Sequence, residues 1–121
     1  MASKYVIGLD FGTDSVRAVI VDALSGKEEA NEVALYKRWT AGLYCEPAQN
    51  QFRQHPLDYI EGLEASVKGA LAKLPAGAAQ GMVAIGIDTT GSTPVAVDRD
   101  GSPLSLNEEL KDNPNALFIF S

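Results

Sequence analysis

The sequence holds very few of the residues from which disulfide frameworks and zinc sites are built. Among 121 residues there is one cysteine, Cys45, and one histidine, His55. A single cysteine excludes an internal disulfide, and one histidine makes a zinc cluster or a Ser-His-Asp triad hard to assemble. Because His55 directly precedes Pro56, which suits a first helical position, we predict a capping or surface role for it.

Positive charge is scarce as well. Ten Lys and Arg residues against sixteen Asp and Glu residues give a formal net charge of −6, so we expect no nucleic-acid partner. No apolar run is long enough to span a bilayer and the first residues do not resemble a signal peptide, so we expect no membrane partner and a cytoplasmic location. The P-loop and dinucleotide glycine signatures are also missing.

The chain opens with two apolar runs on either side of a short polar turn. Tyr5–Leu9 and Val16–Val21 have the length and the Val and Ile content of buried strands. Gly12, between them, allows a sharp bend and a close approach of the backbone to a ligand. Backbone N–H groups around it suit phosphate oxygens. The other interpretation is an ordinary hairpin, because these residue types favour turns for local reasons.

Further elements follow along the chain. We predict a strand within residues 27–39, a long loop over 40–54 and a helix from Pro56 to Leu74 whose apolar residues form one stripe. We also predict a buried strand over Met82–Asp88, a hydroxyl-rich turn after it and a short strand over 94–98. The apolar end, Leu117–Phe120, has the character of an unpaired strand, which invites self-association. Chain ends are normally polar and solvated, so an apolar strand at the end leads us to expect that this chain is part of a longer protein.

Two strand-to-turn units resemble each other: Ile7-Gly8-Leu9-Asp10 and Ile85-Gly86-Ile87-Asp88. Each delivers an aspartate and a glycine-containing, hydroxyl-rich turn at the end of a buried strand. If the two strands are parallel neighbours, both turns lie at one edge of the sheet, where open α/β sheets bind ligands. Asp88 itself we interpret as a structural strand-end aspartate.

The segment Asp10-Phe11-Gly12-Thr13-Asp14-Ser15-Val16-Arg17 resembles the Asp-x-Gly-Thr-x-Ser-x-Arg signature that opens the FGGY carbohydrate kinases of the actin-like ATPase superfamily. Segments 44–51, 55–59, 84–93, 97–104 and 113–116 extend the resemblance over almost the whole chain. It implies an α/β fold of the ribonuclease H-like or actin-like ATPase type. That fold has a mixed sheet, with an antiparallel meander of its first three strands, and a flanking helix. Residues 1–121 would be part of the amino-terminal domain, with the second domain absent.

The resemblance also implies the ligands and their sites. ATP and Mg²⁺ are the expected cofactors, and a small-molecule sugar is the expected substrate. The residues expected at the ATP phosphates are Asp10, Gly12, Thr13 and Ser15, with Asp10 also at the metal. The residues expected to line the sugar side are Thr90, Ser92 and Thr93. No residue of this chain is expected to be the catalytic base, which in the family lies beyond the position of Ser121.

The reaction implied is transfer of the ATP γ-phosphoryl group to a terminal hydroxyl of L-ribulose, a step in L-arabinose breakdown. Glycerol and xylulose kinases typically carry a glutamine in the turn where this chain has Thr89-Thr90-Gly91-Ser92-Thr93. Those two substrates stay open as alternatives, and so does a non-catalytic actin-like module that binds a nucleotide or a partner. By itself this stretch of chain is expected to be inactive, because phosphoryl transfer needs domain closure around the substrates.

Overall fold

The computed structural model describes residues 3–120, which group into two compact units. Among the described residues, the first unit comprises 3–35 and 62–89, and the second comprises 36–61 and 90–120. The boundary runs through the long helix α2 (Pro56–Leu71), whose first turns belong to the second unit and whose remainder belongs to the first.

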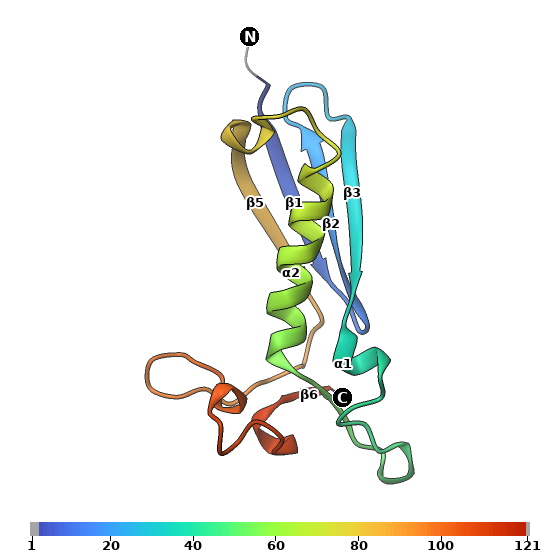
Figure 1. Ribbon diagram of the computed structural model, residues 1–121, viewed down its shortest axis with the longest axis vertical. Helices are drawn as coiled ribbons and strands as arrows, with labels where there is room; N and C mark the ends of the chain where they lie inside the picture. The colour runs from blue at the N-terminus through green and yellow to red at the C-terminus, as the bar shows by residue number, and fades with distance from the viewer. Residues whose placement is uncertain (1–2, 121) are drawn as a thin grey trace. The chain divides into compact units, whose positions relative to one another are not determined.

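A four-stranded sheet forms the frame of the first unit (Figure 1). Its strands are β1 (Tyr5–Phe11), β2 (Ser15–Asp22), β3 (Glu28–Leu35) and β5 (Met82–Thr89), in the spatial order β3-β2-β1-β5. The first three strands form an antiparallel meander, and β5 lies parallel to β1. The predicted mixed sheet with a flanking helix is thereby confirmed.

Alternation along β1 and β2 creates the core of this unit. Ile7 and Leu9 in β1, and Val16 and Ile20 in β2, are all at most 5% exposed. The residues between them face the other side of the sheet, as the period of two in a strand requires. Burial of these side chains is the main driving force for folding of the sheet.

Small residues let α2 approach the sheet closely. The helix buries Gly62, Ser66 and Ala70, which recur every four residues and so lie along one line of its surface. At Gly69 an added Cβ would come within 2.6 Å of the Glu32 side chain on β3. Glycine inside a helix costs about 1 kcal/mol relative to alanine, and here the missing Cβ leaves room for the Glu32 side chain.

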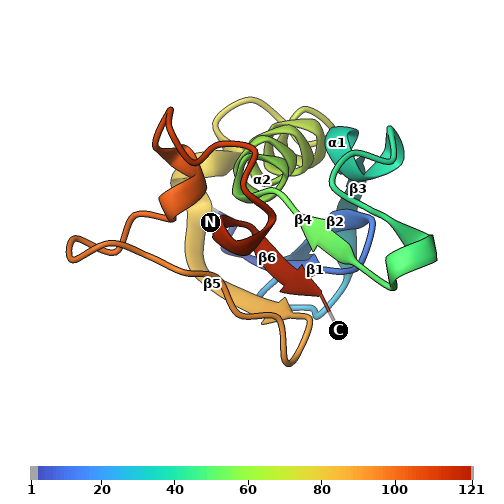
Figure 2. The same cartoon turned by 90° about the horizontal axis from the view of Figure 1, so that it is seen from below.

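The second unit contains little regular structure. It holds α1 (Lys37–Thr40), the start of α2, and a two-stranded antiparallel pair, β4 (Phe52–Gln54) with β6 (Phe118–Phe120). The two strands lie side by side in Figure 2. The second unit also contains short 3₁₀ turns at Pro47–Gln49, Leu104–Leu106 and Pro114–Ala116. The first unit contains one at Ala78–Gly81.

Aromatic rings pack the second unit. Tyr59 stacks on Tyr36 with ring centroids 5.2 Å apart and on Phe118 at 4.6 Å. Trp39 meets the edge of Phe120 at 5.8 Å. Such pairs contribute about 0.5–1.5 kcal/mol each beyond the area they bury.

Buried polar groups complete the second unit. Asp58, 2% exposed, accepts hydrogen bonds from the backbone N–H groups of Arg38 and Trp39 and from the Arg38 guanidinium. Arg38 also binds Glu61 through two hydrogen bonds. His55 accepts a hydrogen bond from the Leu57 N–H at Nδ1, 3.0 Å away, which confirms its predicted capping role.

Three expectations about local structure were wrong. The helix ends at Leu71 rather than Leu74, and β5, which we expected to be a buried strand, is mostly exposed. Residues 94–98 form no strand; Val97 makes one isolated bridge, to Pro103. Pro94 lacks the N–H that a ladder needs, which disfavours a strand there.

The apolar end of the chain also differs from expectation. We predicted an unpaired strand over Leu117–Phe120, but β6 is hydrogen-bonded to β4 and Leu117 is fully buried. The argument for self-association through this segment therefore loses its physical basis. Over residues 3–120, no helix combines the length and the apolar character needed to cross a membrane.

Candidate functional site

The two repeated strand-to-turn units lie next to each other in the first unit. β1 and β5 pair in parallel with Gly8 opposite Gly86 and Asp10 opposite Asp88. Both strands thus end at the same edge of the sheet, as predicted from the repeat. This edge of a parallel pair is where open α/β sheets bind ligands.

A shallow hollow of about 500 Å³ lies over these strand ends. Gly8 and Asp10 contribute to it from the face of β1 opposite to the buried Ile7 and Leu9. A Cβ added at Gly8 or Gly86 would meet nothing within 4 Å. The paired glycines therefore leave the floor of the hollow open, so that a ligand can reach the backbone.

Two negative side chains and one positive side chain surround this hollow, an arrangement that suits a metal cation bound together with an anionic ligand. Asp10 and Asp88, both exposed, stand on adjacent strands about 4.8 Å apart. Like charges directly opposite each other in a sheet are destabilising, and a bound cation would remove that repulsion. On the other side of Asp10, Arg17 is its partner on β2 and lines the same hollow.

These donors fit magnesium only if a ligand supplies further oxygens. Within residues 3–120, no group of three or more His, Cys, Asp or Glu side chains is arranged to hold a metal ion. Mg²⁺ is usually bound by one or two carboxylates together with water and substrate phosphates. Asp10 with Asp88 matches that donor set.

The turn between β1 and β2 is tight. The Gly12 N–H donates to the Ser15 carbonyl at 2.8 Å, and an added Cβ at Gly12 would lie 3.4 Å from that oxygen. Gly12 thus shapes the turn and its amide is already engaged. Thr13 is exposed and Ser15 is half-buried, so neither residue is packed away in the core. Their role at a phosphate stays a prediction.

The turn after β5 holds the residues predicted for the sugar side. The Thr90 hydroxyl donates to the Thr93 hydroxyl at 3.1 Å, and Thr93 donates to the Gly91 carbonyl at 3.0 Å. Ser92 adopts a left-handed conformation with φ of 55°. Within the second unit, Ser92 and Thr93 line a wide, open hollow with Pro94 and Ile119. The internal hydrogen bonds fix the shape of this turn, whereas its contact with a sugar stays a prediction.

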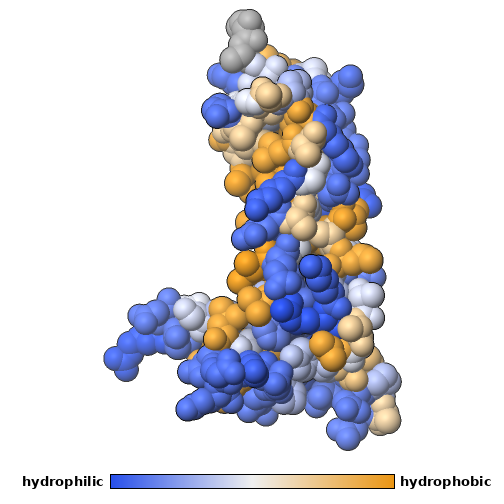
Figure 3. Space-filling view, viewed as in Figure 1, coloured by the Kyte–Doolittle hydropathy of each residue, from blue (hydrophilic) through white to orange (hydrophobic). Residues whose placement is uncertain are grey.

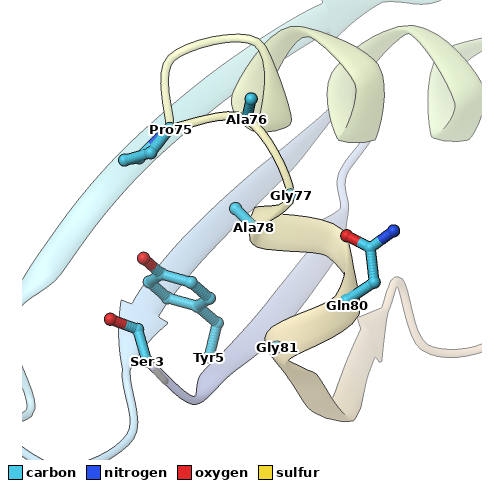
Figure 4. A pocket seen from close by; sticks show the side chains of 8 residues that line it. All are labelled: Ser3, Tyr5, Pro75, Ala76, Gly77, Ala78, Gln80 and Gly81. Atoms are coloured by element: carbon cyan, nitrogen blue, oxygen red, sulfur yellow. The ribbon is translucent and has the colours of Figure 1, made fainter. Parts of the chain in front are cut away.

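Two other hollows are less suited to a phosphate. The hollow of about 290 Å³ at the start of β1 is lined by eight residues, none of them charged (Figure 4). The hollow beside His55 in the second unit contains Arg38 and Lys111, but both cations already have carboxylate partners. Burial, followed by the nearby Arg38 charge, lowers the pKa of His55, which favours the neutral imidazole.

Asp88 lies nearer to the predicted phosphate site than a purely structural role would require. We interpreted it as a structural aspartate, but it is exposed and lines the same hollow as Asp10. The signal was present in the repeated Ile-Gly-x-Asp pattern, since two copies in parallel register must bring both carboxylates together.

The fold is similar to that of a solved kinase structure. A gluconate kinase from Lactobacillus acidophilus superposes with a TM-score of 0.66 over 94% of this chain and 23% of that protein, at 17% sequence identity. At this identity the likeness establishes the fold alone. No family model matches the chain.

Among curated proteins, the chain is similar to ribulokinases. It is 51% identical over 116 residues to the ribulokinase of Vibrio parahaemolyticus and 39% identical over 121 residues to that of Halalkalibacterium halodurans. A third ribulokinase, from Geobacillus thermodenitrificans, is 40% identical over 121 residues. Each match covers 96% of this chain but only about a fifth of the relative. These relatives confirm the predicted resemblance to a carbohydrate kinase.

Proposed function

We propose that residues 1–121 are the amino-terminal part of an ATP-dependent kinase that phosphorylates L-ribulose. The similarity to ribulokinases over 96% of the chain supports the choice of sugar. The parallel, in-register pairing of Asp10 with Asp88 over a glycine floor supports a phosphate and metal site. The remaining length of the enzyme would supply the catalytic base and the adenine pocket. Because ATP is a cytoplasmic metabolite, the cytoplasm is the proposed compartment.

The residues of this chain would bind and orient rather than carry out the chemistry. Asp10 would hold Mg²⁺ directly or through water, and the turn formed by Gly12, Thr13 and Ser15 would lie against the ATP phosphates. Mg²⁺ supplies charge neutralisation at the phosphate oxygens of the transferred group. Thr90, Ser92 and Thr93 would line the sugar. Phosphoryl transfer depends mainly on positioning and charge stabilisation, which matches a site built from a turn and strand ends.

A chimera tests the proposal directly. This chain would replace the matching fifth of the Vibrio parahaemolyticus ribulokinase, and ATP-dependent phosphorylation would be measured with L-ribulose, xylulose and glycerol. We expect activity on L-ribulose, and a loss of about 100-fold or more in kcat/KM on Asp10→Asn, which is about 2.7 kcal/mol of transition-state stabilisation.

Asp100→Asn is the matched control, because Asp100 is an exposed turn aspartate outside both predicted sites. It should leave kcat/KM within about twofold, as is usual for surface changes. A preference for xylulose or glycerol would contradict the choice of sugar. Full activity of the Asp10→Asn chimera would contradict the metal and phosphate role while leaving the sugar assignment standing.

The isolated 121-residue chain provides a second test. Titration with Mg·ATP should show at most weak binding and no turnover, since only part of the site is present. Turnover above background that disappears on Asp10→Ala would show that the chain is sufficient by itself, which contradicts the proposal.

A further inference from the structure

The turn predicted for the sugar side is held at both of its ends within the second unit. At one end, the Pro94 carbonyl accepts a hydrogen bond from the Ile119 N–H on β6, 2.9 Å away. At the other end, a hydrogen bond joins the Thr90 hydroxyl to the hydroxyl of Tyr59. The shape of the turn therefore depends on residues that lie far from it in the sequence.

Stacked rings hold the Tyr59 side chain in place. Its ring centroid lies 5.2 Å from that of Tyr36 and 4.6 Å from that of Phe118. Hydrophilic residues predominate on the face of the second unit seen in Figure 3, whereas Tyr36 is fully buried, so the stack belongs to the core of this unit. Because protein cores are close-packed, a ring in such a stack has little freedom to move its hydroxyl.

A buried amide orients the Tyr59 hydroxyl. The hydroxyl donates a hydrogen bond to Gln54 Oε1 at 2.8 Å, and Gln54 is fully buried on β4. Burial raises the pKa of Tyr59 and the hydrogen bond with Thr90 offsets only part of that rise, so the phenol keeps its proton at neutral pH. Since Gln54 pairs with Phe118, the amide and one of the rings that fix Tyr59 come from the same strand pair.

The backbone at Ser92 gives a reason for such anchoring. Its φ of 55° lies in the left-handed region, which is unfavourable for a residue other than glycine. Backbone of this kind persists where the surrounding structure holds it, and it occurs often at ligand sites. The Thr90 hydroxyl donates to Thr93, and Thr93 donates to the Gly91 carbonyl, in the peptide group before Ser92. Hydrogen bonds thus connect the anchor at Thr90 to the strained position.

We propose that Tyr59 is a positioning residue for sugar binding, because its hydroxyl, fixed by Gln54, holds the turn over 90–93 in the conformation that receives the sugar. The inference rests on the proposed function, since that function assigns this turn to the sugar. Tyr59 acts through Thr90 and does not contact the sugar or ATP. Its effect is therefore expected in how strongly the sugar binds and not in the rate of phosphoryl transfer once both substrates are bound.

The positioning can be measured on the 121-residue chain without any enzymatic activity. Tyr59→Phe removes one oxygen and keeps the ring, so stacking is retained. In NMR spectra, the backbone amides of residues 91–93 should shift and show lower order parameters, whereas those of β1 and β2 should not change. The matched control is Tyr44→Phe, which removes another hydroxyl of the second unit, one that donates to Asp112 at 2.8 Å. It should leave the amides of the turn as in the wild type.

The effect on sugar binding is measured in the chimera with the Vibrio parahaemolyticus ribulokinase. Tyr59→Phe should raise the KM for L-ribulose about fivefold, the size expected for loss of one hydrogen bond. It should leave kcat and the KM for ATP within about twofold, because a general loss of folded enzyme would lower kcat and would not distinguish the two substrates. Tyr44→Phe should leave all three constants within about twofold.

A double-mutant cycle tests whether Tyr59 acts through Thr90. Thr90→Val removes the hydroxyl at nearly constant volume and should raise the KM for L-ribulose at least as much as Tyr59→Phe. The double variant should then have the KM of Thr90→Val alone, because the interaction is already absent. Thr90→Ser keeps a hydroxyl and should bind L-ribulose nearly as tightly as the wild type.

Three results would overturn the inference. Unchanged turn amides in Tyr59→Phe would show that the hydroxyl does not hold the turn. A KM for L-ribulose within about twofold of the wild type, in an active Tyr59→Phe chimera, would show that sugar binding does not depend on it. Additive effects of Tyr59→Phe and Thr90→Val would mean that Tyr59 does not act through Thr90. A wild-type chimera without activity on any sugar would instead contradict the proposed function, and the NMR comparison would still decide whether Tyr59 positions the turn.

Discussion

The core inside each of the two units is stabilised by a different kind of interaction. In the first, strands with strict alternation bury aliphatic residues such as Val16 and Ile20. In the second, stacked rings surround buried polar residues, among them Gln54, His55 and Asp58. Burial of aliphatic side chains in the first core is non-directional, whereas the second core depends on specific hydrogen-bond partners.

The difference shows in how far apart the partners lie in sequence. Within β1 and β2 the pattern that creates the core is visible over a few neighbouring residues. Arg38 and Asp58 are 20 positions apart, and Tyr59 stacks on Phe118 from a distant segment. We expect the units to respond differently to the same kind of perturbation. Trp39 is the only tryptophan and lies in the second unit, so its fluorescence reports on that unit.

The largest expected effect is on the aliphatic core. Ile20→Ala, at a fully buried position of β2, should lower the free energy of unfolding by about 3 kcal/mol, through lost burial and the cavity left behind. Urea unfolding followed by far-UV circular dichroism measures it. Leu24→Ala, at a side chain 70% exposed, should change stability by less than about 0.5 kcal/mol. Equal effects of the two would mean that the sheet core is not packed as described.

A smaller loss is expected from the polar core. Asp58→Ala leaves the Arg38 and Trp39 N–H groups without their acceptor, and unsatisfied buried donors cost about 1–3 kcal/mol. Arg38 keeps Glu61, so we expect about 2 kcal/mol, seen as an earlier urea transition in Trp39 fluorescence. Glu109→Ala, an exposed acidic residue of the same unit, serves as control. An earlier transition seen only by circular dichroism and not by Trp39 fluorescence would contradict the prediction, because it would place the destabilisation in the first unit.

The smallest effect is a dependence on pH confined to the second unit. Burial lowers the pKa of His55, so between its folded value and about 6.5 the unfolded chain binds more protons. His55 should therefore contribute its full stabilisation above about pH 6.5, and the free energy of unfolding should fall as the pH decreases below that value.

Trp39 fluorescence during urea unfolding, repeated at each pH, measures this dependence. His55→Gln should flatten it. The range stays above the acid region where Glu61 also contributes, since hydrogen bonding to Arg38 lowers the pKa of that carboxyl. A stability that is independent of pH in the wild type would argue against a buried neutral His55.

Much of the first unit could be predicted without coordinates. The Val and Ile runs located β1, β2 and β5, the apolar stripe located α2, and the repeated Ile-Gly-x-Asp pattern predicted a shared edge for both turns. These features depend on local periodicity, which is a property of neighbouring residues. The prediction of a strand over 94–98 was wrong because a short run beside a proline contains too few residues to show a period.

The sequence by itself determined the meander, the long helix and the tight turn at Gly12, because each follows from residue types within a few positions of one another. Only the tertiary structure decided that Asp88 lies beside Asp10, that β6 pairs with β4 and that Asp58 accepts a hydrogen bond from Arg38. Those pairings join segments far apart in the chain. Many partners are compatible with a given polar or apolar residue, and the packed arrangement selects one of them.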